Sequence, residues 1–493
     1  MKKTESAAEW KKQRIEDINK ALSENKYADF IDDALFEELA GAPSAYSKEK
    51  TEELTDKALS LKGLELSEAA YLINLKEPSA WEKLFRAARE VKDRVYGNRI
   101  VLFAPLYMGS RCVNNCAYCG MREDNSGIVR KNLSFNEITG EIKALASQGH
   151  KRLLLVYGEH SAASAENIAA DMKTIYAYKN KTDAIRRVNV NAAPLFEDEY
   201  SIIKDAGIGT YQVFQETYKR KVYDKLHPAG SIKNIYDWRL FAQHRAQKAG
   251  IDDVAIGVLF GLYDWKYEVL SLIAHANALE KEFGAGAHTI SFPRLENAFN
   301  TSFAELKKYA VSDEDMRKII TILRLAVPYT GLILTAREKP GLRKELIKLG
   351  VSQTDAGTSI AVGGYSEKLS SNILNRQQFE IADTRSLEEY IFELTKEGYI
   401  PSFCTAGYRC GRTGCEFMDF ARAGKVKNFC VPNAILTFKE YLEDYAGKEL
   451  KEFGSGMIEN YINDVEKNFS AGSAAKIREF LKRIENGERD IYF

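Results

Sequence analysis

Short apolar segments alternate with amphipathic segments through the middle of the chain. Eight apolar segments have the length and composition of buried strands. They are residues 100–108, 152–159, 187–193, 209–216, 253–261, 288–295, 331–337 and 351–359. The intervals have helical spacing, and residues 134–149 open with a capping box from Ser134 to Glu137 and end at a glycine. This alternation predicts an α/β fold, a (β/α)8 barrel of parallel strands.

The two flanks of this region have helical patterns. Residues 1–90 are charged and rich in alanine, as in AWEKLFRAAREVKDRVYG, and contain no strand-like run. Residues 366–493 are also helical in pattern, apart from a stretch rich in Cys and Gly at 402–416. We therefore expect a helical N-terminal extension over 1–90, a barrel over 91–365 and a helical C-terminal subdomain over 366–493 with a second cysteine cluster.

The composition disfavours some classes of binding partner and indicates a cellular compartment. The 70 basic and 70 acidic side chains cancel, so no net field attracts nucleic acid or an anionic membrane surface. No stretch approaches the roughly 18 apolar residues of a membrane span, and the first residues lack the apolar core of a signal peptide. We expect a soluble, cytoplasmic protein without nucleic-acid or membrane partners. The seven cysteines form two groups, which favours ligand clusters in a reducing, anaerobic cytosol over disulfides.

The first cysteine group follows the first predicted strand. Cys112, Cys116 and Cys119 have the spacing C-x3-C-x2-C, and the aromatic Tyr118 precedes the last of them. Three thiolates on one loop leave one iron of a 4Fe-4S cluster open to a small ligand, which is typical of radical S-adenosylmethionine (SAM) enzymes. A structural zinc site or a set of redox thiols is the alternative. Zinc sites usually pair C-x2-C with a second pair, and no such pair lies nearby in sequence.

A second motif is predicted to lie beside the triplet. Barrel enzymes carry their functional groups on the loops after the strands, so the triplet lies at the barrel mouth. Gly158 and Glu159 end the second predicted strand. In the radical SAM pattern an acidic residue here accepts a hydrogen bond from the SAM ammonium. The alternative for Glu159 is a solvated loop carboxylate.

Several longer blocks resemble one enzyme family. They are GTYQVFQETY at 209–218, KLHPAG at 225–230, IGVLFGLYDW at 256–265, HTISFPR at 288–294 and VSQTDAG at 351–357. These blocks resemble the tyrosine lyases of the radical SAM superfamily, which include the FeFe-hydrogenase maturase and the 2-iminoacetate synthase of the thiamine pathway. The resemblance covers most of residues 90–450. The block PSFCTAGYRCGRTGCEFM at 401–418 looks like the maturase and not the thiamine enzyme.

The resemblance implies a reaction. Bound SAM yields a 5′-deoxyadenosyl radical that takes hydrogen from the substrate amine, and the Cα–Cβ bond of tyrosine then breaks to give p-cresol and dehydroglycine. In the maturase the dehydroglycine is processed to CO and cyanide. The resemblance also implies an amino acid as the small-molecule substrate, reduced flavodoxin or ferredoxin as electron donor, and maturation partner proteins.

The same resemblance assigns roles to individual residues. Gln215, Glu216 and Arg239 match positions that bind SAM. Arg337, at the end of the seventh strand, matches the group that holds the substrate carboxylate, and an arginine fork suits a small anionic amino acid. Tyr263 and Ser359 are further candidates for this pocket. For each of these side chains a loop-closing hydrogen bond is the alternative.

The C-terminal cysteines depart from the family pattern. The maturase holds a second cluster with C-x2-C-x22-C, and Cys404 and Cys430 match its first and third cysteines. Gly407 stands in the middle position, while Cys410 and Cys415 lie on the same Gly-rich loop. We expect a second cluster held by Cys404, Cys430 and at least one of the two additional cysteines. Three ligands would leave an open iron, and four would close the cluster and lower CO and cyanide output. Loss of the second cluster is the alternative.

A histidine is predicted to lie near this second group. His288 starts the sixth strand and would face the opposite end of the barrel from the triplet, where it matches a ligand for an extra iron. His275 is a second candidate. A hydrogen-bonded structural histidine is the alternative for both.

Three functions remain in view from the sequence. The leading hypothesis is a radical SAM lyase for tyrosine or a close aromatic amino acid, of the hydrogenase-maturase type. The second is a related amino acid lyase that makes no CO or cyanide. The third is a non-catalytic iron–sulfur carrier, but a carrier needs neither Glu159 nor Arg337.

Overall fold

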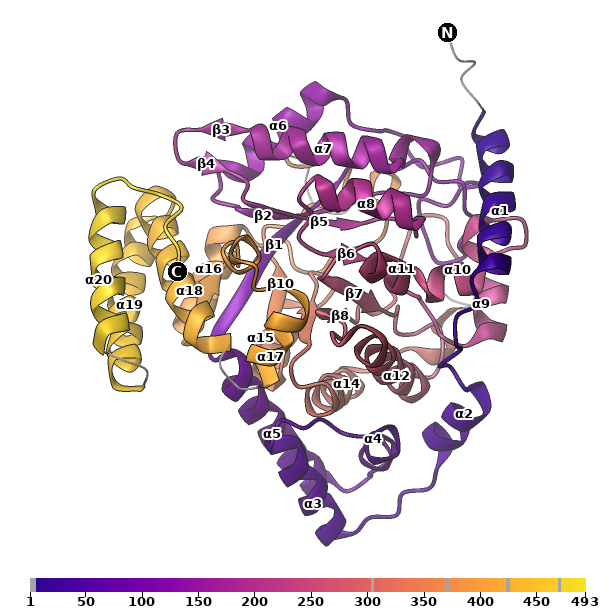
Figure 1. Ribbon diagram of the computed structural model, residues 1–493, viewed down its shortest axis with the longest axis horizontal. Helices are drawn as coiled ribbons and strands as arrows, with labels where there is room; N and C mark the ends of the chain where they lie inside the picture. The colour runs from indigo at the N-terminus through magenta and orange to yellow at the C-terminus, as the bar shows by residue number, and fades with distance from the viewer. Residues whose placement is uncertain (1–5, 303–305, 369–372, 423–425, 469–470) are drawn as a thin grey trace.

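The computed structural model describes residues 6–302, 306–368, 373–422, 426–468 and 471–493 (Figure 1). Eight parallel strands close into a barrel, which confirms the predicted fold. The strands are β1 (Arg99–Tyr107), β2 (Arg152–Val156), β5 (Arg187–Asn191), β6 (Tyr211–Gln212), β7 (Val254–Gly257), β8 (Thr289–Ser291), β9 (Gly331–Leu334) and β10 (Gln353–Asp355). They follow this order around the barrel, which closes where β10 pairs with β1 at Gln353 and Val101. Each strand matches one predicted segment.

Helices connect the strands and form an outer layer. They are α6 (Phe135–Ala146), α7 (Ala165–Ala177), α8 (Glu197–Asp205), α9 (Arg220–Leu226), α10 (Tyr236–Leu240), α11 (Ala242–Lys248), α12 (Trp265–Phe283), α14 (Asp313–Ala326), α15 (Pro340–Leu349) and α16 (Leu387–Lys396). The predicted capping box is confirmed, because the Ser134 hydroxyl accepts from the Glu137 amide and the Glu137 carboxylate accepts from the Ser134 amide. A short hairpin, β3 (Lys179–Asn180) with β4 (Asp183–Ala184), projects after α7.

A ninth strand, which the sequence pattern did not predict, joins the barrel from the C-terminal side. β11 (Ile400–Ser402) pairs in parallel with the first residues of β1, from Arg99 opposite Ile400 to Val101 opposite Ser402. The last residues of β1 pair instead with β2. This pairing fixes the segment that begins at Cys404 against the amino-terminal end of the barrel.

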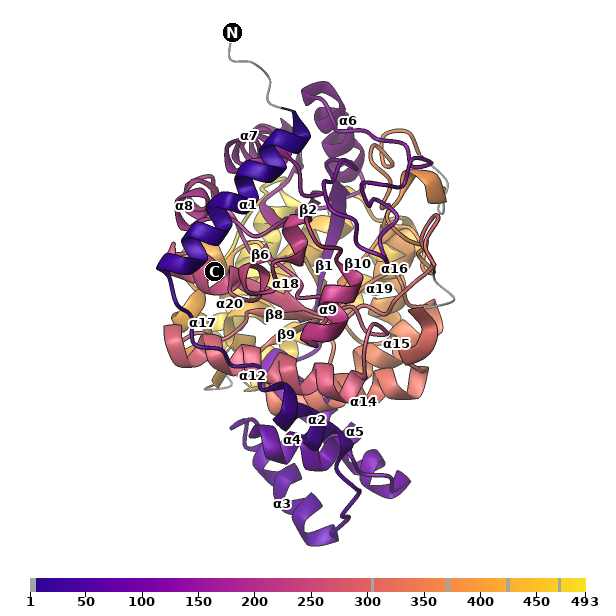
Figure 2. The ribbon, with the colours of Figure 1, turned by 90° about the vertical axis from the view of Figure 1, so that its right-hand side faces the viewer.

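The N-terminal residues form five helices, α1 (Ala7–Glu24), α2 (Asp33–Gly41), α3 (Lys48–Leu59), α4 (Leu66–Ile73) and α5 (Pro78–Tyr96). α5 buries Trp81, Leu84 and Val91 at helical spacing and packs against α14. α1 lies across one side of the barrel (Figure 2), where Arg14 forms an ion pair of 2.7 Å with Glu199 at the start of α8.

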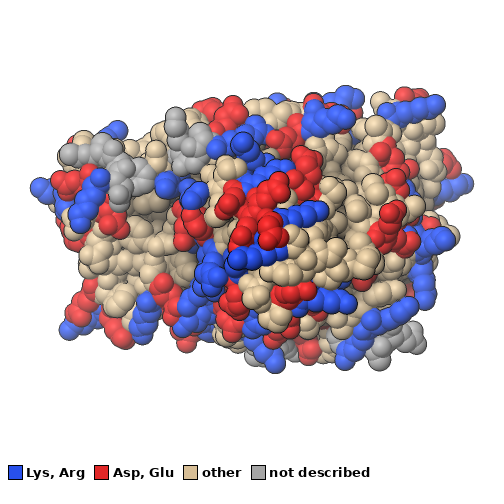
Figure 3. Space-filling model, turned by 90° about the horizontal axis from the view of Figure 1, so that it is seen from below, with Lys and Arg blue, Asp and Glu red and all other residues tan. Residues whose placement is uncertain are grey.

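The C-terminal residues form α17 (Gly414–Arg422), α18 (Val426–Asp444), α19 (Lys448–Asn468) and α20 (Ala471–Glu485). α18 packs on β11, and α19 and α20 lie outside it, at the far left of Figure 1. No helix in the described part of the chain is both long and apolar enough to cross a membrane. Basic and acidic side chains are interspersed on the face shown in Figure 3.

Candidate active site

A cavity of about 1480 Å³ opens at the carboxyl ends of the barrel strands. Nine of the predicted site residues line it: Cys112, Cys116, Tyr118, Cys119, Gly158, Glu159, Glu216, Arg239 and Arg337. Eight of them come from loops after the strands and Arg239 comes from α10; these segments are far apart in the sequence and meet at the carboxyl ends of the parallel strands. The predicted placement of these residues at one barrel mouth therefore agrees with the geometry.

Gly158 lets the loop after β2 approach the triplet loop closely. A Cβ at this position would lie 2.4 Å from the carbonyl oxygen of Arg111 and 3.2 Å from Cβ of Cys112. The amide of Val113 donates to the carbonyl of Glu159 at 2.8 Å. A side chain at residue 158 would push the two loops apart, which explains why a glycine precedes the acidic residue.

Asn114, inside the triplet, joins three loops. Its Nδ2 donates to Oε2 of Glu159 at 2.6 Å, and its Oδ1 accepts from the backbone N–H of Lys233 at 3.0 Å. Burial raises the pKa of Glu159 even though this hydrogen bond favours the carboxylate. Asn114 therefore holds the Glu159 carboxyl toward the cavity in a fixed orientation.

A second acidic residue faces the same cavity from the loop after β6. Glu216 has φ of 72°, a left-handed conformation that is uncommon outside glycine. Its Oε1 lies 2.6 Å from Nζ of Lys233 and 3.5 Å from Nη2 of Arg239. Burial opposes ionisation of Glu216, but these two cations outweigh it and lower its pKa. Glu216 is therefore a carboxylate held on a strained backbone, a combination that accumulates at functional sites.

Cys116 and Tyr118 are buried, whereas Cys112 and Cys119 are partly exposed. Burial raises the pKa of Cys112, and it raises the pKa of Cys116 to about 12. The Tyr118 hydroxyl lies 2.8 Å from Nε2 of His227, whose Nδ1 lies 2.8 Å from the carbonyl of Tyr223. With the His227 proton on Nδ1, Nε2 accepts from Tyr118 and fixes the ring beside the last two cysteines.

Arg337 lies on the loop after β9, across the cavity. Its guanidinium stacks at 3.4 Å over the Phe379 ring, and Nη1 donates to the carbonyl of Arg294 at 3.0 Å. Its buried Nε has no hydrogen-bond partner in the described residues. Burial lowers the pKa of Arg337, but a guanidinium remains charged in proteins. Arg337 is therefore an oriented cation with hydrogen-bonding capacity left for an anion.

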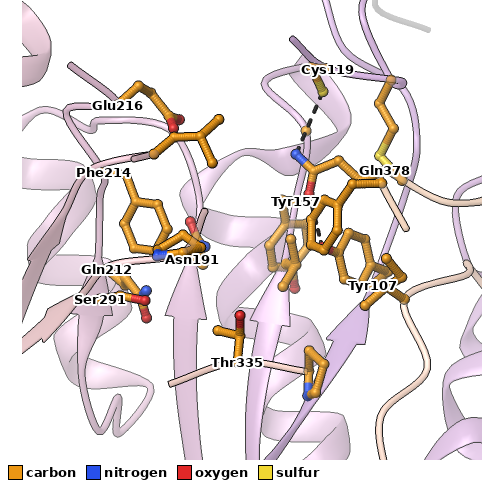
Figure 4. A pocket seen from close by; sticks show the side chains of 18 of the residues that line it. Tyr107, Cys119, Tyr157, Asn191, Gln212, Phe214, Glu216, Ser291, Thr335 and Gln378 are labelled. Atoms are coloured by element: carbon orange, nitrogen blue, oxygen red, sulfur yellow. Dashed lines mark hydrogen bonds between the residues drawn. The ribbon is translucent and has the colours of Figure 1, made fainter. Parts of the chain in front are cut away.

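Polar side chains gather on one side of the deep part of the cavity. Gln212, Asn191 and Ser291 lie close together beneath Phe214 (Figure 4). The buried Oγ of Ser291 has no partner among the described residues. On the opposite wall, Gln378 donates to Sγ of Cys119 at 3.5 Å and accepts from the Tyr107 hydroxyl at 2.9 Å.

Three predicted residues do not line this cavity. The Tyr263 hydroxyl donates to Glu37 of the N-terminal region at 2.9 Å. The backbone of Ser359 is tied to the Tyr365 hydroxyl at 3.0 Å. Gln215 is buried, and its side-chain amide has no partner in the described chain. The structure therefore does not bring Tyr263 or Ser359 into the lining of the cavity that contains Arg337.

The second cysteine group is divided by the structure. Cys404, Cys430 and His288 line a separate cavity, together with Gly407, at the amino-terminal end of the barrel. Cys410 and Cys415 are exposed and do not line it. The expectation that one of them supplies a third ligand is therefore not met.

Each additional cysteine contacts a different carbonyl on the outside of the fold. Sγ of Cys410 lies 3.6 Å from the carbonyl of Phe493, and Sγ of Cys415 lies 3.3 Å from that of Phe283. His275 lies elsewhere, where Nδ1 is 2.7 Å from the Tyr218 hydroxyl. It is not a ligand candidate for this cavity.

The two cysteine groups fit an iron–sulfur cluster unequally. At the mouth, three thiols on one loop line one large cavity, and Gly158 provides room beside them. At the other end only two thiols line the cavity. In neither place does the described chain bring three Cys, His, Asp or Glu side chains close enough to bind one metal ion. The three thiols at the mouth are too far apart to bind one metal ion, but this does not exclude a 4Fe-4S cluster there. In such a cluster each cysteine would bind a different iron.

Sequence reasoning missed four residues of the mouth. Asn114 lies between the cysteines of the triplet, and Ser291 lies within the block at 288–294. No feature of the sequence distinguished either residue from its neighbours. Lys233 and Gln378 are distant in sequence from the cysteine triplet. Their contacts with Glu216 and Cys119 are apparent only in the folded structure.

Comparisons with known proteins agree with this geometry. The family model for the radical SAM superfamily matches residues 106–273, and that for the biotin and thiamin synthesis associated domain matches residues 291–400. The 2-iminoacetate synthase of Escherichia coli (strain K12) is 29% identical over 358 residues, which cover 71% of this chain and 90% of that protein.

Two solved structures are similar over nearly the whole chain. A crystal structure of HydG, a maturase of the [FeFe]-hydrogenase, is 46% identical with a TM-score of 0.90, covering 94% of this chain and 100% of that one. The FeFe-hydrogenase maturase HydG from Carboxydothermus hydrogenoformans is 37% identical with a TM-score of 0.76, covering 96% and 99%. With this likeness and the triplet at the barrel mouth, the chain belongs to the HydG-like family of radical SAM enzymes.

Proposed function

We propose that this enzyme is a lyase that cleaves the Cα–Cβ bond of tyrosine to p-cresol and dehydroglycine. The observation that carries the proposal is one cavity that contains both the three thiols and Arg337. The thiols and Glu159 suit a 4Fe-4S cluster with SAM, and Arg337 suits the carboxylate of an amino acid. When bound, the cluster and SAM supply the radical that starts the reaction.

The cavity also has features that favour tyrosine. Its walls include Phe103, Leu154 and Ile333, which suit an aromatic ring. The unpartnered Oγ of Ser291 lies on the polar side of the deep part, where a phenol hydroxyl would relieve it. An unsatisfied buried hydroxyl costs about 1–3 kcal/mol, so a substrate that satisfies it gains on that scale.

The chain's own residues then have distinct tasks. Glu159, oriented by Asn114, accepts from the SAM ammonium. Glu216 is held by Lys233 and Arg239 as a carboxylate on the same side. Arg337 binds the substrate carboxylate with its free N–H groups and fixes the amine and the Cα–Cβ bond relative to the triplet. This orientation is the main contribution that protein side chains make to a radical reaction.

A lyase without CO or cyanide formation is the second candidate. The observation that favours it is that only Cys404 and Cys430, of the four C-terminal cysteines, line the second cavity. We therefore propose p-cresol and dehydroglycine as the products, without CO and cyanide. The electron donor would be reduced flavodoxin or ferredoxin.

The test is an anaerobic assay of the reconstituted chain with SAM, dithionite and tyrosine, phenylalanine or tryptophan in separate reactions. We expect p-cresol and 5′-deoxyadenosine from tyrosine, detected by mass. The proposal is wrong if SAM is cleaved with another amino acid while tyrosine yields no p-cresol. Cys116→Ala is the inactive control, and CO and cyanide measured in the same reactions separate the two candidates.

A further inference from the structure

The second cavity is a chamber at the amino-terminal end of the barrel. Arg99 begins β1, Arg187 begins β5 and His288 precedes β8. The segment after β11 contributes Cys404 to the far side, and α18 contributes Cys430. About 590 Å³ of space lies between the lining side chains. The chamber is thus built from barrel strands together with the C-terminal region, and it is separate from the barrel mouth.

The chamber lacks a ligand set for a cubane. Gly407 lines it where the family pattern has its middle cysteine, and Cys410 and Cys415 contact carbonyls on the outside. His288 also lines the chamber, with its ring against Phe417 and its Nδ1 3.3 Å from Oδ1 of Asp253, but it adds no thiolate. Two thiolates are too few to hold a 4Fe-4S cluster, which is normally bound by at least three cysteines.

The charges around the chamber are unbalanced. Arg99, Arg152 and Arg187 are all buried near Cys404. Arg187 is paired with Asp253 at 3.0 Å, whereas neither of the other two has an acidic partner among the described residues. The Nε atoms of Arg99 and Arg152 also lack hydrogen-bond partners there. Arg99 also hydrogen-bonds to the Cys404 thiol, and the three arginines lower the pKa of that thiol despite its burial. Three buried cations therefore face one carboxylate and one thiol, and the remaining positive charge favours a further anion in the chamber.

The backbone at Cys404 is strained as well. Its φ is 47°, in the left-handed region, and its amide donates to Oγ of Ser402 at 3.2 Å. Strain of this kind costs on the order of 1–3 kcal/mol and persists mainly at functional sites. The loop that begins at Cys404 is therefore held against the chamber, although it supplies only one thiol there.

We propose that this chamber binds a small carboxylate against Arg99 and holds no iron–sulfur cluster. The planar guanidinium matches a carboxylate with two parallel hydrogen bonds, and Nε of Arg99 is available for one of them. A single metal ion is a poorer fit, because no three suitable ligands are close enough in the described residues. The inference does not depend on the identity of the lyase substrate.

Gly407 offers a direct test of the missing ligand. An added Cβ would meet only the Arg412 carbonyl, at 3.8 Å, and the backbone there is not left-handed. Gly407→Cys therefore adds a third thiol at the chamber without a clash. Gly407→Ser is the matched control, because it adds a side chain of similar size without a thiolate.

The first experiment counts iron and sulfide after anaerobic reconstitution of the full chain with Cys112, Cys116 and Cys119 all replaced by Ala. We expect a count near zero, a rise to about four irons with Gly407→Cys, and no rise with Gly407→Ser. About four irons without Gly407→Cys, or no rise with it, would overturn the proposal. If the triple variant does not fold, iron is counted in the unmodified chain instead. We then expect about four irons, from the cluster at the mouth alone, and about eight irons would overturn the proposal.

The second experiment measures carboxylate binding by calorimetry with sodium glycolate, a two-carbon carboxylate that does not react with thiols. The chain carries Arg337→Ala, so that the proposed substrate clamp does not bind the probe. We expect saturable binding with Kd on the order of 1 mM, weakened at least roughly tenfold by Arg99→Gln and less by Arg99→Lys. No saturable binding, or binding indifferent to both variants, would overturn the proposal.

A matched control addresses non-specific effects of charge. Arg409 lies on the same loop as Cys404, but it pairs with Asp490 at 2.7 Å and does not line the chamber. Arg409→Gln should leave glycolate binding unchanged. An equal loss in Arg409→Gln and Arg99→Gln would show that the loss reflects net charge and not a site at Arg99, and it would overturn the assignment.

Discussion

Nδ2 of Asn114 donates to Oε2 of Glu159 at 2.6 Å, and this bond joins the cysteine loop to the loop after β2. Both side chains are buried, so the bond is shielded from water and the carboxyl has a defined direction. The group proposed to bind the SAM ammonium is therefore positioned by a residue inside the cysteine triplet. We therefore expect binding of the cluster and binding of SAM to be coupled through the Asn114 amide.

Asn114→Ala should weaken SAM binding while the chain remains folded. A hydrogen bond to a charged group contributes about 1.5–3 kcal/mol, so we expect roughly a ten- to hundredfold rise in Kd for SAM, measured by equilibrium binding. Asn115→Ala is the matched control, because Oδ1 of the neighbouring Asn115 accepts instead from the Asp124 amide at 2.8 Å. Equal effects of the two substitutions would contradict a positioning role for Asn114.

Gly158→Ala should damage the mouth without unfolding the barrel. The new Cβ would lie 2.4 Å from the Arg111 carbonyl, so the cysteine loop must shift. We expect the rate of 5′-deoxyadenosine formation to fall by roughly tenfold or more, since misplacement by about 1 Å can cost a hundredfold. Gly341→Ala, at the start of α15 with no atom within 4 Å of the added Cβ, is the control and should keep full activity.

The strands and the main site loops were predictable because they depend on local patterns. The apolar run before Cys112 forms β1, and Ser134 with Glu137 caps α6 as expected. Once the barrel order is known, parallel strands place Gly158 and Arg337 at the same mouth. Each of these inferences depends either on residues that are close in sequence or on the regular alternation of strand and helix in the barrel.

The remaining features depend on contacts that no local pattern encodes. β11 has three residues and includes a proline, so its pairing with β1 carries no sequence signal. The spacing of Cys410 and Cys415 suggested ligands, but a short helical turn from Gly407 to Cys410 turns this loop outward. Tyr263 follows a predicted strand, yet its hydroxyl donates to Glu37 of the N-terminal region.

Arg337→Ala should weaken substrate binding by roughly ten- to a hundredfold, since a charge-assisted bidentate pair contributes about 1.5–3 kcal/mol. Arg337→Lys should restore only part of it, because an ammonium cannot form two parallel hydrogen bonds. The measurement is p-cresol formation as a function of tyrosine concentration. Unchanged kinetics in Arg337→Ala would remove this residue from the substrate site.

Ser291→Ala should reduce discrimination between tyrosine and phenylalanine. The unpartnered Oγ of Ser291 lies in the deep cavity, and a phenol hydroxyl would satisfy it. We expect kcat/KM for tyrosine to fall by roughly tenfold while turnover with phenylalanine changes little. A parallel loss with both amino acids would indicate that the substitution disturbs the barrel core instead.

Glu268 on α12 should make the free energy of unfolding depend on pH. Burial raises its pKa to about 8, although the Thr217 hydroxyl and the Tyr218 amide donate to the carboxyl group. The unfolded chain loses this proton near the ordinary value of 4.5, whereas the folded chain keeps it until about pH 8. The contribution of the protonated Glu268 to the free energy of unfolding is therefore fully present below pH 4.5 and is lost as the pH rises toward 8.

Glu268→Gln should remove this dependence, because the amide stays neutral at every pH and can still hydrogen-bond to both partners. Each unit of pKa difference corresponds to about 1.4 kcal/mol, so the variant should gain a few kcal/mol over the unmodified chain between pH 5 and pH 8. Urea unfolding at the two pH values measures this difference. Glu282→Gln, whose side chain is 52% exposed on the same helix, is the control. A stability difference between Glu268→Gln and the unmodified chain that stays constant over this range would show that Glu268 ionises at its ordinary pKa in the folded protein.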